Sequence, residues 1–301
     1  MMKGLFSGLL LLSLCSSAVC KPVADAVMRD PPRDAAHPAR MAVVHIPSHG
    51  VEINGLLYLA GGAGPHPLMI FFHGMPGNEQ NLDVAQAVRR SGWNVLTLHY
   101  RGSWGSPGTY SYTHLLEDGA AAVAFARDPK NANDYSIDTH SIVLAGHSTG
   151  GFVATLTAAA TPGVAGLILI SGTDDAGEAS VANASPEKWR AWVKDSYADS
   201  METLAGCTPD GLAREALEHS ASWKFATAAP HLTKIPVLLV TSEDGFAAEG
   251  DALGRAIGAA GGSAPAKIHM ETDHAYSDHR IALQAAVVSW LGAHLVKGPG
   301  A

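Results

Sequence analysis

Residues 146–151, with the sequence Gly-His-Ser-Thr-Gly-Gly, decide the fold that we expect for this chain. The stretch reads G-x-S-x-G, follows the apolar run 141–145 and precedes a helical, small-residue stretch at 152–160. A strand and a helix joined by so tight a turn need flanking glycines, because larger side chains would collide. The pattern occurs by chance in a chain with 32 glycines, but the flanking strand and helix make it specific. The turn therefore presents Ser148 as a candidate nucleophile at a helix N-terminus, where negative charge is favoured.

The composition indicates one large α/β domain. The chain has 301 residues, of which 47% are hydrophobic, and this is enough for a single sizeable core. Only 16% of the residues are charged, and 20 Lys and Arg against 28 Asp and Glu give a formal net charge of −8. This balance argues against a basic nucleic-acid-binding face.

The N-terminus has the features of a signal peptide, which we assign to residues 1–20. A positively charged start precedes the apolar stretch 5–14, which is too short for a stable membrane span. Cleavage after Ala18 fits a small-x-small pattern, and cleavage after Cys20 or Ala26 is an alternative, as is lipid attachment at Cys20. We therefore expect export, to the periplasm or out of the cell.

Apolar runs alternate with helical stretches after an extended leader, 21–40, that is rich in Pro, Asp and Ala. The predicted strands are 41–46, 55–60, 68–72, 94–100, 142–145, 164–170, 237–241 and 267–271. The predicted helices are 82–90, 114–126, 152–160, 248–260 and 281–295. We expect helix 114–126 to turn Glu117 and Asp118 outward. This alternation predicts a mainly parallel sheet that is covered by helices on both faces.

One long segment, about 173–233, interrupts the alternation because it has no strand signal. It contains two helix-like stretches, 186–192 and 210–219. We expect an inserted helical cap over the C-terminal edge of the sheet, where ligands bind in such folds. The domain as a whole is predicted to cover residues 41–297.

The segment His73-Gly74-Met75-Pro76-Gly77, the serine turn, and an acidic residue and a histidine after the last two strands resemble the α/β-hydrolase fold family. The resemblance covers roughly residues 41–297. It implies a mostly parallel sheet flanked by helices, no cofactor and no metal. It also implies nucleophile, acid and histidine in this chain order, which the sequence supplies as Ser148, Asp244 and His274.

Each of these three residues is assigned on chemical grounds, and two of the assignments have an alternative candidate. A serine hydroxyl is a poor nucleophile, so Ser148 needs a base, for which His274 is preferred to His279. A carboxylate would orient that histidine and stabilise its cation. Asp244 is preferred to its neighbour Glu243 for this role. A metal site on the two histidines and their neighbouring aspartates would leave the serine turn unexplained.

The backbone N–H groups of Met75 and Thr149 are the expected oxyanion donors, because they lie in the loop after a strand and directly after the nucleophile. Arg101, in the loop after strand 94–100, is expected to pair with a carboxylate such as Asp118. Aromatic side chains at the mouth and in the cap are candidates to line the substrate pocket or to pack the cap onto the body. These candidates are Trp104, Tyr110, Trp189 and Trp192.

The segments 101–108 and 272–280 look most similar to exported esterase and aminopeptidase-like branches of the family. The expected function is therefore a serine hydrolase that cleaves carboxylic esters through an acyl-enzyme. The alternatives are a peptidase or amidase, a catalytically silent binding module, and an acyltransferase. The expected partner is a small ester or a short peptide as substrate, with no nucleic acid.

Overall fold

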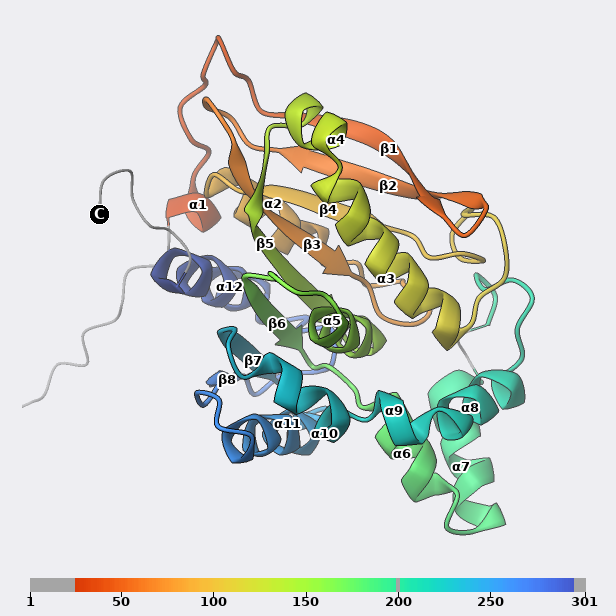
Figure 1. The fold of residues 1–301 in the computed structure, drawn as a ribbon. Coiled ribbons are helices and arrows are strands. Elements are labelled where there is room, and N and C mark those ends of the chain that lie inside the picture. The colour runs from red at the N-terminus through yellow and green to blue at the C-terminus, as the bar shows by residue number, and fades with distance from the viewer. Residues whose placement is uncertain (1–24, 199–200, 295–301) are drawn as a thin grey trace, which may run out of the picture.

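The structure, a computed structural model, describes residues 25–198 and 201–294 (Figure 1). Within these ranges, one eight-stranded sheet has the order β1-β2-β4-β3-β5-β6-β7-β8. The strands are β1 (Arg40–Ser48), β2 (Val51–Leu59), β3 (His66–Phe72), β4 (Asn94–Leu98), β5 (Ile137–His147), β6 (Gly166–Ile170), β7 (Val237–Thr241) and β8 (Ala266–His269). β2 is antiparallel to β1 and β4, and the remaining neighbours are parallel. The mostly parallel sheet that the sequence predicts is confirmed.

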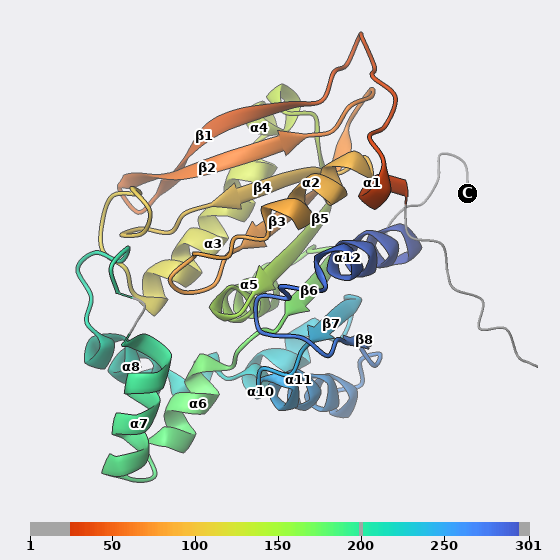
Figure 2. The ribbon, with the colours of Figure 1, turned by 180° about the vertical axis from the view of Figure 1, so that it is seen from behind.

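Helices cover both faces of this sheet (Figures 1 and 2). Alternate residues of β3 explain the two layers: Leu68, Ile70 and Phe72 pack on one side, and Met69 and Phe71 pack on the other. The first side carries α3 (Tyr112–Arg127), α5 (Thr149–Ala160) and α11 (Ala247–Ala259), and the second carries α1 (Asp25–Met28), α2 (Leu82–Arg90) and α12 (Arg280–His294). The short α4 (Pro129–Asp134) links α3 to β5. Because both faces are buried there, residues 142–146 of β5 form a continuous buried run rather than an alternating one.

From residue 25 on, the leader is only partly extended, which corrects the prediction of an extended segment there. Residues 25–28 form α1, and the Ala26 carbonyl accepts a hydrogen bond from Arg90 Nε at 2.6 Å. Ala26 and Val27 also pack against the apolar layer beneath α2 and α12, and this burial favours the helical turn. The predicted signal peptide, residues 1–20, lies outside the described residues.

The described part of the segment 173–233 is mostly helical, with a loop at 201–208. Its elements are α6 (Asp175–Ala182), α7 (Pro186–Tyr197), α8 (Pro209–Glu218), α9 (Ser220–Trp223), α10 (Phe225–Ala228) and the 3₁₀ turn η1 (Ala229–Leu232). We call α6 to α9 the cap helices; they form a group to one side of the sheet (Figure 1). Glu215 of α8 accepts hydrogen bonds from the Tyr112 and Thr113 amides at 2.8 and 2.9 Å, which fixes the cap helices to the start of α3.

Several element ends differ from prediction by one to five residues. Helix α3 begins at Tyr112 rather than 114, because the Ser111 hydroxyl caps it by accepting from the His114 amide at 3.2 Å. Strand β8 ends at His269 rather than 271, since the chain turns there and the Thr272 amide bonds the Met270 carbonyl at 2.9 Å. Strand β4 ends at Leu98, and the loop toward Arg101 begins two residues earlier than predicted.

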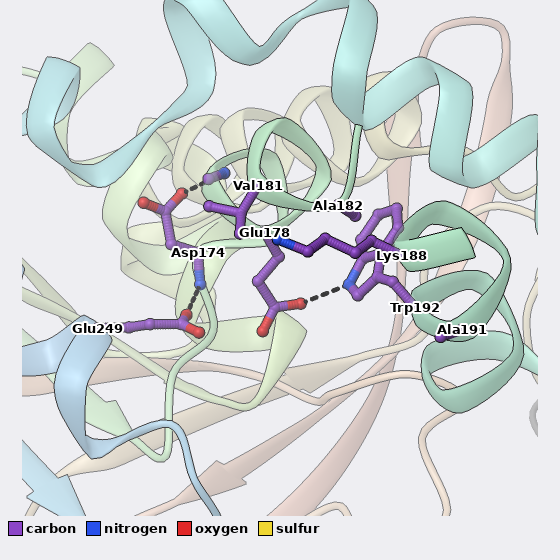
Figure 3. Close-up of a pocket in the computed structure, with 9 residues that line it drawn as sticks. Asp174, Glu178, Val181, Ala182, Lys188, Ala191, Trp192 and Glu249 are labelled. Carbon is purple, nitrogen blue, oxygen red and sulfur yellow. Dashed lines mark hydrogen bonds between the residues drawn. The ribbon is translucent and has the colours of Figure 1, made fainter. Parts of the chain in front are cut away.

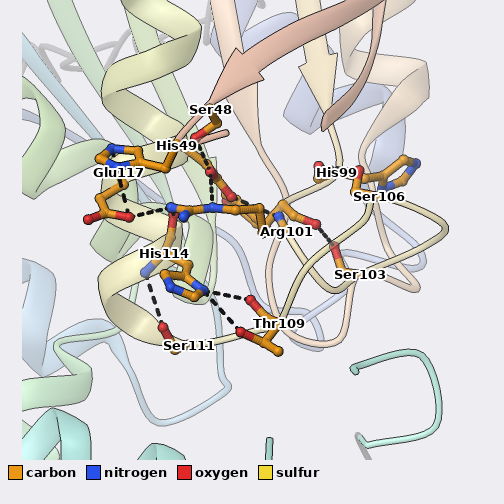
Figure 4. Close-up of polar contacts among 12 residues, drawn as sticks. Ser48, His49, His99, Arg101, Ser103, Ser106, Thr109, Ser111, His114 and Glu117 are labelled. Atoms are coloured by element: carbon orange, nitrogen blue, oxygen red, sulfur yellow. Dashed lines mark hydrogen bonds and ion pairs between the residues drawn. The ribbon is translucent and has the colours of Figure 1, made fainter. Parts of the chain in front are cut away.

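Asp118 is fully buried, so the prediction that it points outward is wrong. The predicted pairing with Arg101 is confirmed and supplies the reason: Arg101 Nε donates to Asp118 Oδ1 at 2.7 Å, and the Arg101 amide donates to Oδ2 at 2.7 Å. The Ser48 hydroxyl donates to the same carboxylate at 2.6 Å. The half-buried Glu117 carboxylate accepts a hydrogen bond from Arg101 Nη2 at 2.5 Å (Figure 4). One carboxylate thus joins α3, the loop after β4 and the β1–β2 hairpin.

We expect Asp118→Ala to lower the free energy of unfolding by about 3–5 kcal/mol, because it leaves the buried Arg101 cation without its inner partner. Glu117→Ala is the matched control, and it should cost about 1 kcal/mol or less because its side chain is partly solvated. Urea unfolding measures both variants. Equal losses for the two would contradict the central place that we give to Asp118.

Candidate active site

The backbone of Ser148 has an unusual conformation, with φ 56° and ψ −131°. A residue other than glycine rarely adopts such angles, and they persist only where the surroundings enforce them. Here the Ser148 amide donates to the Ile170 carbonyl of β6 at 3.0 Å, and its carbonyl accepts from Gly151 N at 2.7 Å. The turn between β5 and α5 therefore holds Ser148 at the C-terminal edge of the sheet, as a nucleophile elbow does.

Two glycines allow α5 to approach the sheet closely enough for this turn. A Cβ atom on Gly146 would lie 1.9 Å from the Gly150 carbonyl oxygen. A Cβ on Gly150 would lie 2.1 Å from the Phe72 oxygen at the end of β3. Any larger residue at either position would displace backbone, so the G-x-S-x-G pattern has a steric cause here.

His274 and Asp244 are brought together at the same edge of the sheet. His274 Nδ1 lies 2.8 Å from Asp244 Oδ2, and the other carboxylate oxygen accepts from Phe246 N at 3.0 Å. Burial raises the pKa of Asp244, but hydrogen bonds from His274 and Ser171 outweigh it and hold the pKa well below its usual range. The carboxylate therefore stays ionised and can only accept, so His274 carries its proton on Nδ1 and leaves Nε2 free.

Glu243 and His279, the alternative candidates for acid and base, have other partners in the structure. Glu243 is 65% exposed and bonds His269 Nε2 of β8 at 2.8 Å, away from His274. His279 bonds Asp278 at 2.8 Å and begins the first turn of α12, since its carbonyl accepts from the Leu283 amide. Of the paired alternatives, Asp244 and His274 have the geometry of an acid and the base that it orients.

His147 connects the serine turn to the histidine loop. Its ring lies 4.7 Å from that of His274, centroid to centroid, and its Nε2 donates to the His274 carbonyl oxygen at 2.9 Å. Because His147 precedes Ser148 in the chain, this contact joins the backbone of the candidate base to the chain neighbour of the candidate nucleophile. Phe246 packs edge-on against His274 from the other side, with 5.4 Å between ring centroids.

A cluster of buried hydroxyl groups lies beside Asp244, and no sequence pattern predicted it. The Ser171 hydroxyl lies 2.8 Å from Tyr276 OH and 3.1 Å from the Ser242 hydroxyl. Ser171 and Ser242 also help to lower the pKa of Asp244. Burial raises the pKa of Tyr276 to about 12, so its hydroxyl remains a donor at physiological pH.

Arg280 is a second feature that the sequence did not reveal. Its Nη1 donates to the Ala275 carbonyl at 2.7 Å, next to His274. Its other nitrogens donate to Asn81 Oδ1 at 3.0 Å and Asp83 Oδ2 at 2.9 Å. Arg280 therefore ties the histidine loop to the segment that follows the proposed oxyanion loop, residues 73–77.

The structure places this oxyanion loop directly against Ser148. A Cβ atom on Gly74 would lie 2.8 Å from Ser148 Cβ and 3.4 Å from its Oγ. Met75 follows Gly74, and Thr149 is the first residue of α5, where amides have no acceptor within the helix. Both expected oxyanion donors therefore border Ser148, and their role stays a prediction.

The aromatic candidates have different environments. Trp104 is 38% exposed and donates from Nε1 to the Pro76 carbonyl at 2.7 Å, so it holds the oxyanion loop. Tyr110 is 2% exposed and belongs to the apolar core rather than to an open mouth. In the cap helices the Trp189 and Trp192 rings are 5.5 Å apart, and Trp192 Nε1 donates to Glu178 at 2.9 Å.

A cavity of about 640 Å³ lies between α6, α7 and the start of α11, and Trp192 lines it (Figure 3). Two residues that line the cavity, Asp174 and Glu249, are connected to the candidate site. Asp174 follows Thr173, whose amide donates to the Ser148 carbonyl at 3.3 Å. The Glu249 amide bonds the carbonyl of Phe246, the residue that packs on His274. Burial and the neighbouring Glu178 raise the pKa of Glu249.

Between residues 25–198 and 201–294, no three His, Cys, Asp or Glu side chains are grouped to hold a metal ion. Asp273 instead accepts from Ser277, and Asp278 is bonded to His279 and Thr272. In the same ranges, none of the helices combines the length and apolar character that crossing a membrane requires.

The model of the alpha/beta hydrolase family matches residues 69–295, and the chain belongs to this family. No curated protein matches the chain in sequence.

Solved structures share the fold at low sequence identity. Carboxyl esterase 2 from the fungus Tuber melanosporum aligns with a TM-score of 0.64 and 18% identity, over 91% of this chain and 97% of its own. A hyperthermophilic esterase from the archaeon Pyrobaculum calidifontis aligns with a TM-score of 0.61 and 20% identity, over 86% and 84%. The acylaminoacyl peptidase of Pyrococcus horikoshii gives a TM-score of 0.61 and 15% identity, over 87% of this chain and 43% of that one.

The two carboxylates after β7 give a matched pair of variants. If Asp244 orients the base, Asp244→Asn lowers kcat/KM for ester hydrolysis by about 10³- to 10⁴-fold, because an amide no longer fixes the proton on Nδ1. Glu243→Gln, at the exposed neighbour, should stay within about twofold. Steady-state kinetics on a chromogenic ester measure both, and the reverse order of effects would reassign the acid.

Proposed function

We propose that this chain is a serine hydrolase that cleaves carboxylic esters through an acyl-enzyme. The supporting observation is the 2.8 Å bond between His274 Nδ1 and Asp244 Oδ2, at the same edge of the sheet as the strained turn of Ser148. In this proposal Ser148 is the nucleophile, His274 the general base and acid, and Asp244 the residue that orients the histidine.

The protonation state of the site sets the order of steps. His274 Nε2 accepts the Ser148 proton as the serine oxygen bonds to the ester carbonyl carbon. The carbonyl oxygen becomes an oxyanion, which the Met75 and Thr149 amides stabilise. The ester C–O bond then breaks, and His274 returns the proton to the leaving alcohol. Water attacks the acyl-enzyme by the same route, releasing the acid and restoring Ser148.

We place part of the substrate in the cavity beside the cap helices. Its walls continue from residues that contact Ser148 and His274, and its volume of about 640 Å³ is in the range that small-molecule sites occupy. Trp192 supplies an apolar wall, in keeping with its expected place in the pocket. Trp189 packs beside Trp192, and Trp104 lies at the oxyanion loop.

Export is also part of the proposal. The apolar stretch and the small residues within 1–20 carry it, and they support a periplasmic or secreted enzyme. Mass spectrometry of the protein recovered from the periplasm or medium tests this, and a product that retains residue 1 would count against cleavage.

A substrate screen tests the proposed reaction. We expect the wild type to hydrolyse p-nitrophenyl esters, with kcat/KM changing along a series of acyl chain lengths as the cavity fills. Ser148→Ala should lose at least about 10³-fold, because the nucleophile is removed while the fold remains.

Aminoacyl-p-nitroanilides are run in parallel. Hydrolysis of the anilides alone would replace the esterase proposal by a peptidase or amidase. Ester turnover that survives Ser148→Ala would contradict the assignment of the nucleophile. Added alcohol that diverts most product to a new ester would indicate an acyltransferase.

A further inference from the structure

We propose that His147 is a positioning residue for His274, fixing the distance between the base and the nucleophile through one hydrogen bond. This inference rests on the proposed function and goes beyond it. The bond joins His147 Nε2 to the His274 carbonyl oxygen at 2.9 Å. A carbonyl can only accept, so the His147 proton is on Nε2, and its Nδ1 is a bare acceptor.

The burial of His147 shows that this polar contact is costly to keep. The side chain is buried, and its Nδ1 has no hydrogen-bond partner within the described residues. An apolar side chain at this position would avoid the desolvation of two ring nitrogens. The retained polar group therefore has a specific acceptor, and that acceptor is the backbone of the candidate base.

The charge state of His147 suits this role. Burial above all, together with the neighbouring His274 and Arg280, lowers its pKa to about 3, while the His274 carbonyl and Asp244 act in the opposite direction. His147 is therefore neutral while His274 takes up a proton, with 4.7 Å between the two rings. A neutral neighbour avoids the repulsion that a second cation would exert on the imidazolium.

The anchoring of the histidine loop explains why one bond matters. Arg280 holds Ala275 from α12, and the Ser171 hydroxyl holds Tyr276 from the end of β6. The His147 bond acts on residue 274 itself, and His147 is the chain neighbour of Ser148. Motion of the loop relative to the serine turn must therefore break this bond, whereas the other two contacts do not involve β5. A misplacement of about 1 Å between reacting groups can cost about 10²-fold in rate.

Three substitutions separate positioning from simple packing. His147→Gln keeps an N–H donor near the Nε2 position, His147→Asn keeps a polar amide that is too short to reach, and His147→Leu removes the donor. We expect Gln to retain kcat within about threefold and Asn and Leu to lose about 10- to 100-fold, with KM nearly unchanged. In the pH profile of kcat/KM, the acid limb should move to lower pH in the Asn and Leu variants, because a displaced His274 forms a weaker hydrogen bond with Asp244.

His66→Leu is the matched control. The His66 ring also lies within hydrogen-bond distance of backbone carbonyl oxygens, Gly92 at 3.0 Å and Gly62 at 3.1 Å. However, His66 is the first residue of β3, at the edge of the sheet opposite to Ser148. The His66→Leu variant should have a lower unfolding temperature but the wild-type kcat and pH profile. The proposal is overturned if Gln and Asn are equally impaired, or if Leu keeps the wild-type kcat and pH profile. If Leu does not fold, the comparison of Gln with Asn decides. Absence of wild-type ester hydrolysis would instead show that the proposed function, on which this inference rests, is wrong.

Discussion

The close approach of α5 to the ends of β3 and β5 is the constraint on which the site depends. Gly146 and Gly150 have no room for a Cβ atom, since it would lie 1.9 and 2.1 Å, respectively, from a backbone oxygen. This approach forces Ser148 into its unusual backbone conformation and brings the oxyanion loop at Gly74 into contact with it. The energetic cost of the strained turn is offset by the buried core around it, which lies on both faces of the sheet.

The other residues reach the site because parallel strands end at one edge. Asp244 follows β7 and His274 follows β8, so both loops leave the sheet on the side where β5 delivers Ser148. Their side chains are then held by contacts from distant parts of the chain: His147, Arg280 and the hydroxyl cluster of Ser171 and Tyr276. This gives the site a rigid frame before any substrate arrives.

The sequence predicted the fold class, the bounds of α2 and β7, and the order of the three candidate residues, because these depend on local pattern. It favoured Asp244 over Glu243 without the contacts that separate them, since a shift of one residue decides which side chain faces His274 and which turns to His269. It placed Asp118 outside although it predicted the pair with Arg101, because the other partner of this carboxylate, Ser48, is 70 residues away. The contacts of Arg280 likewise join α12 to the start of α2, almost 200 residues apart in the chain.

The central claim is that Ser148 is an activated nucleophile. Reaction with a fluorophosphonate, followed by peptide mass spectrometry, tests it directly, because the reagent forms a stable adduct only with a serine whose proton is accepted by a base. The account predicts one adduct per chain, on Ser148, and loss of labelling in Ser148→Ala. An unlabelled wild type that is folded, or an adduct on another residue, would contradict it.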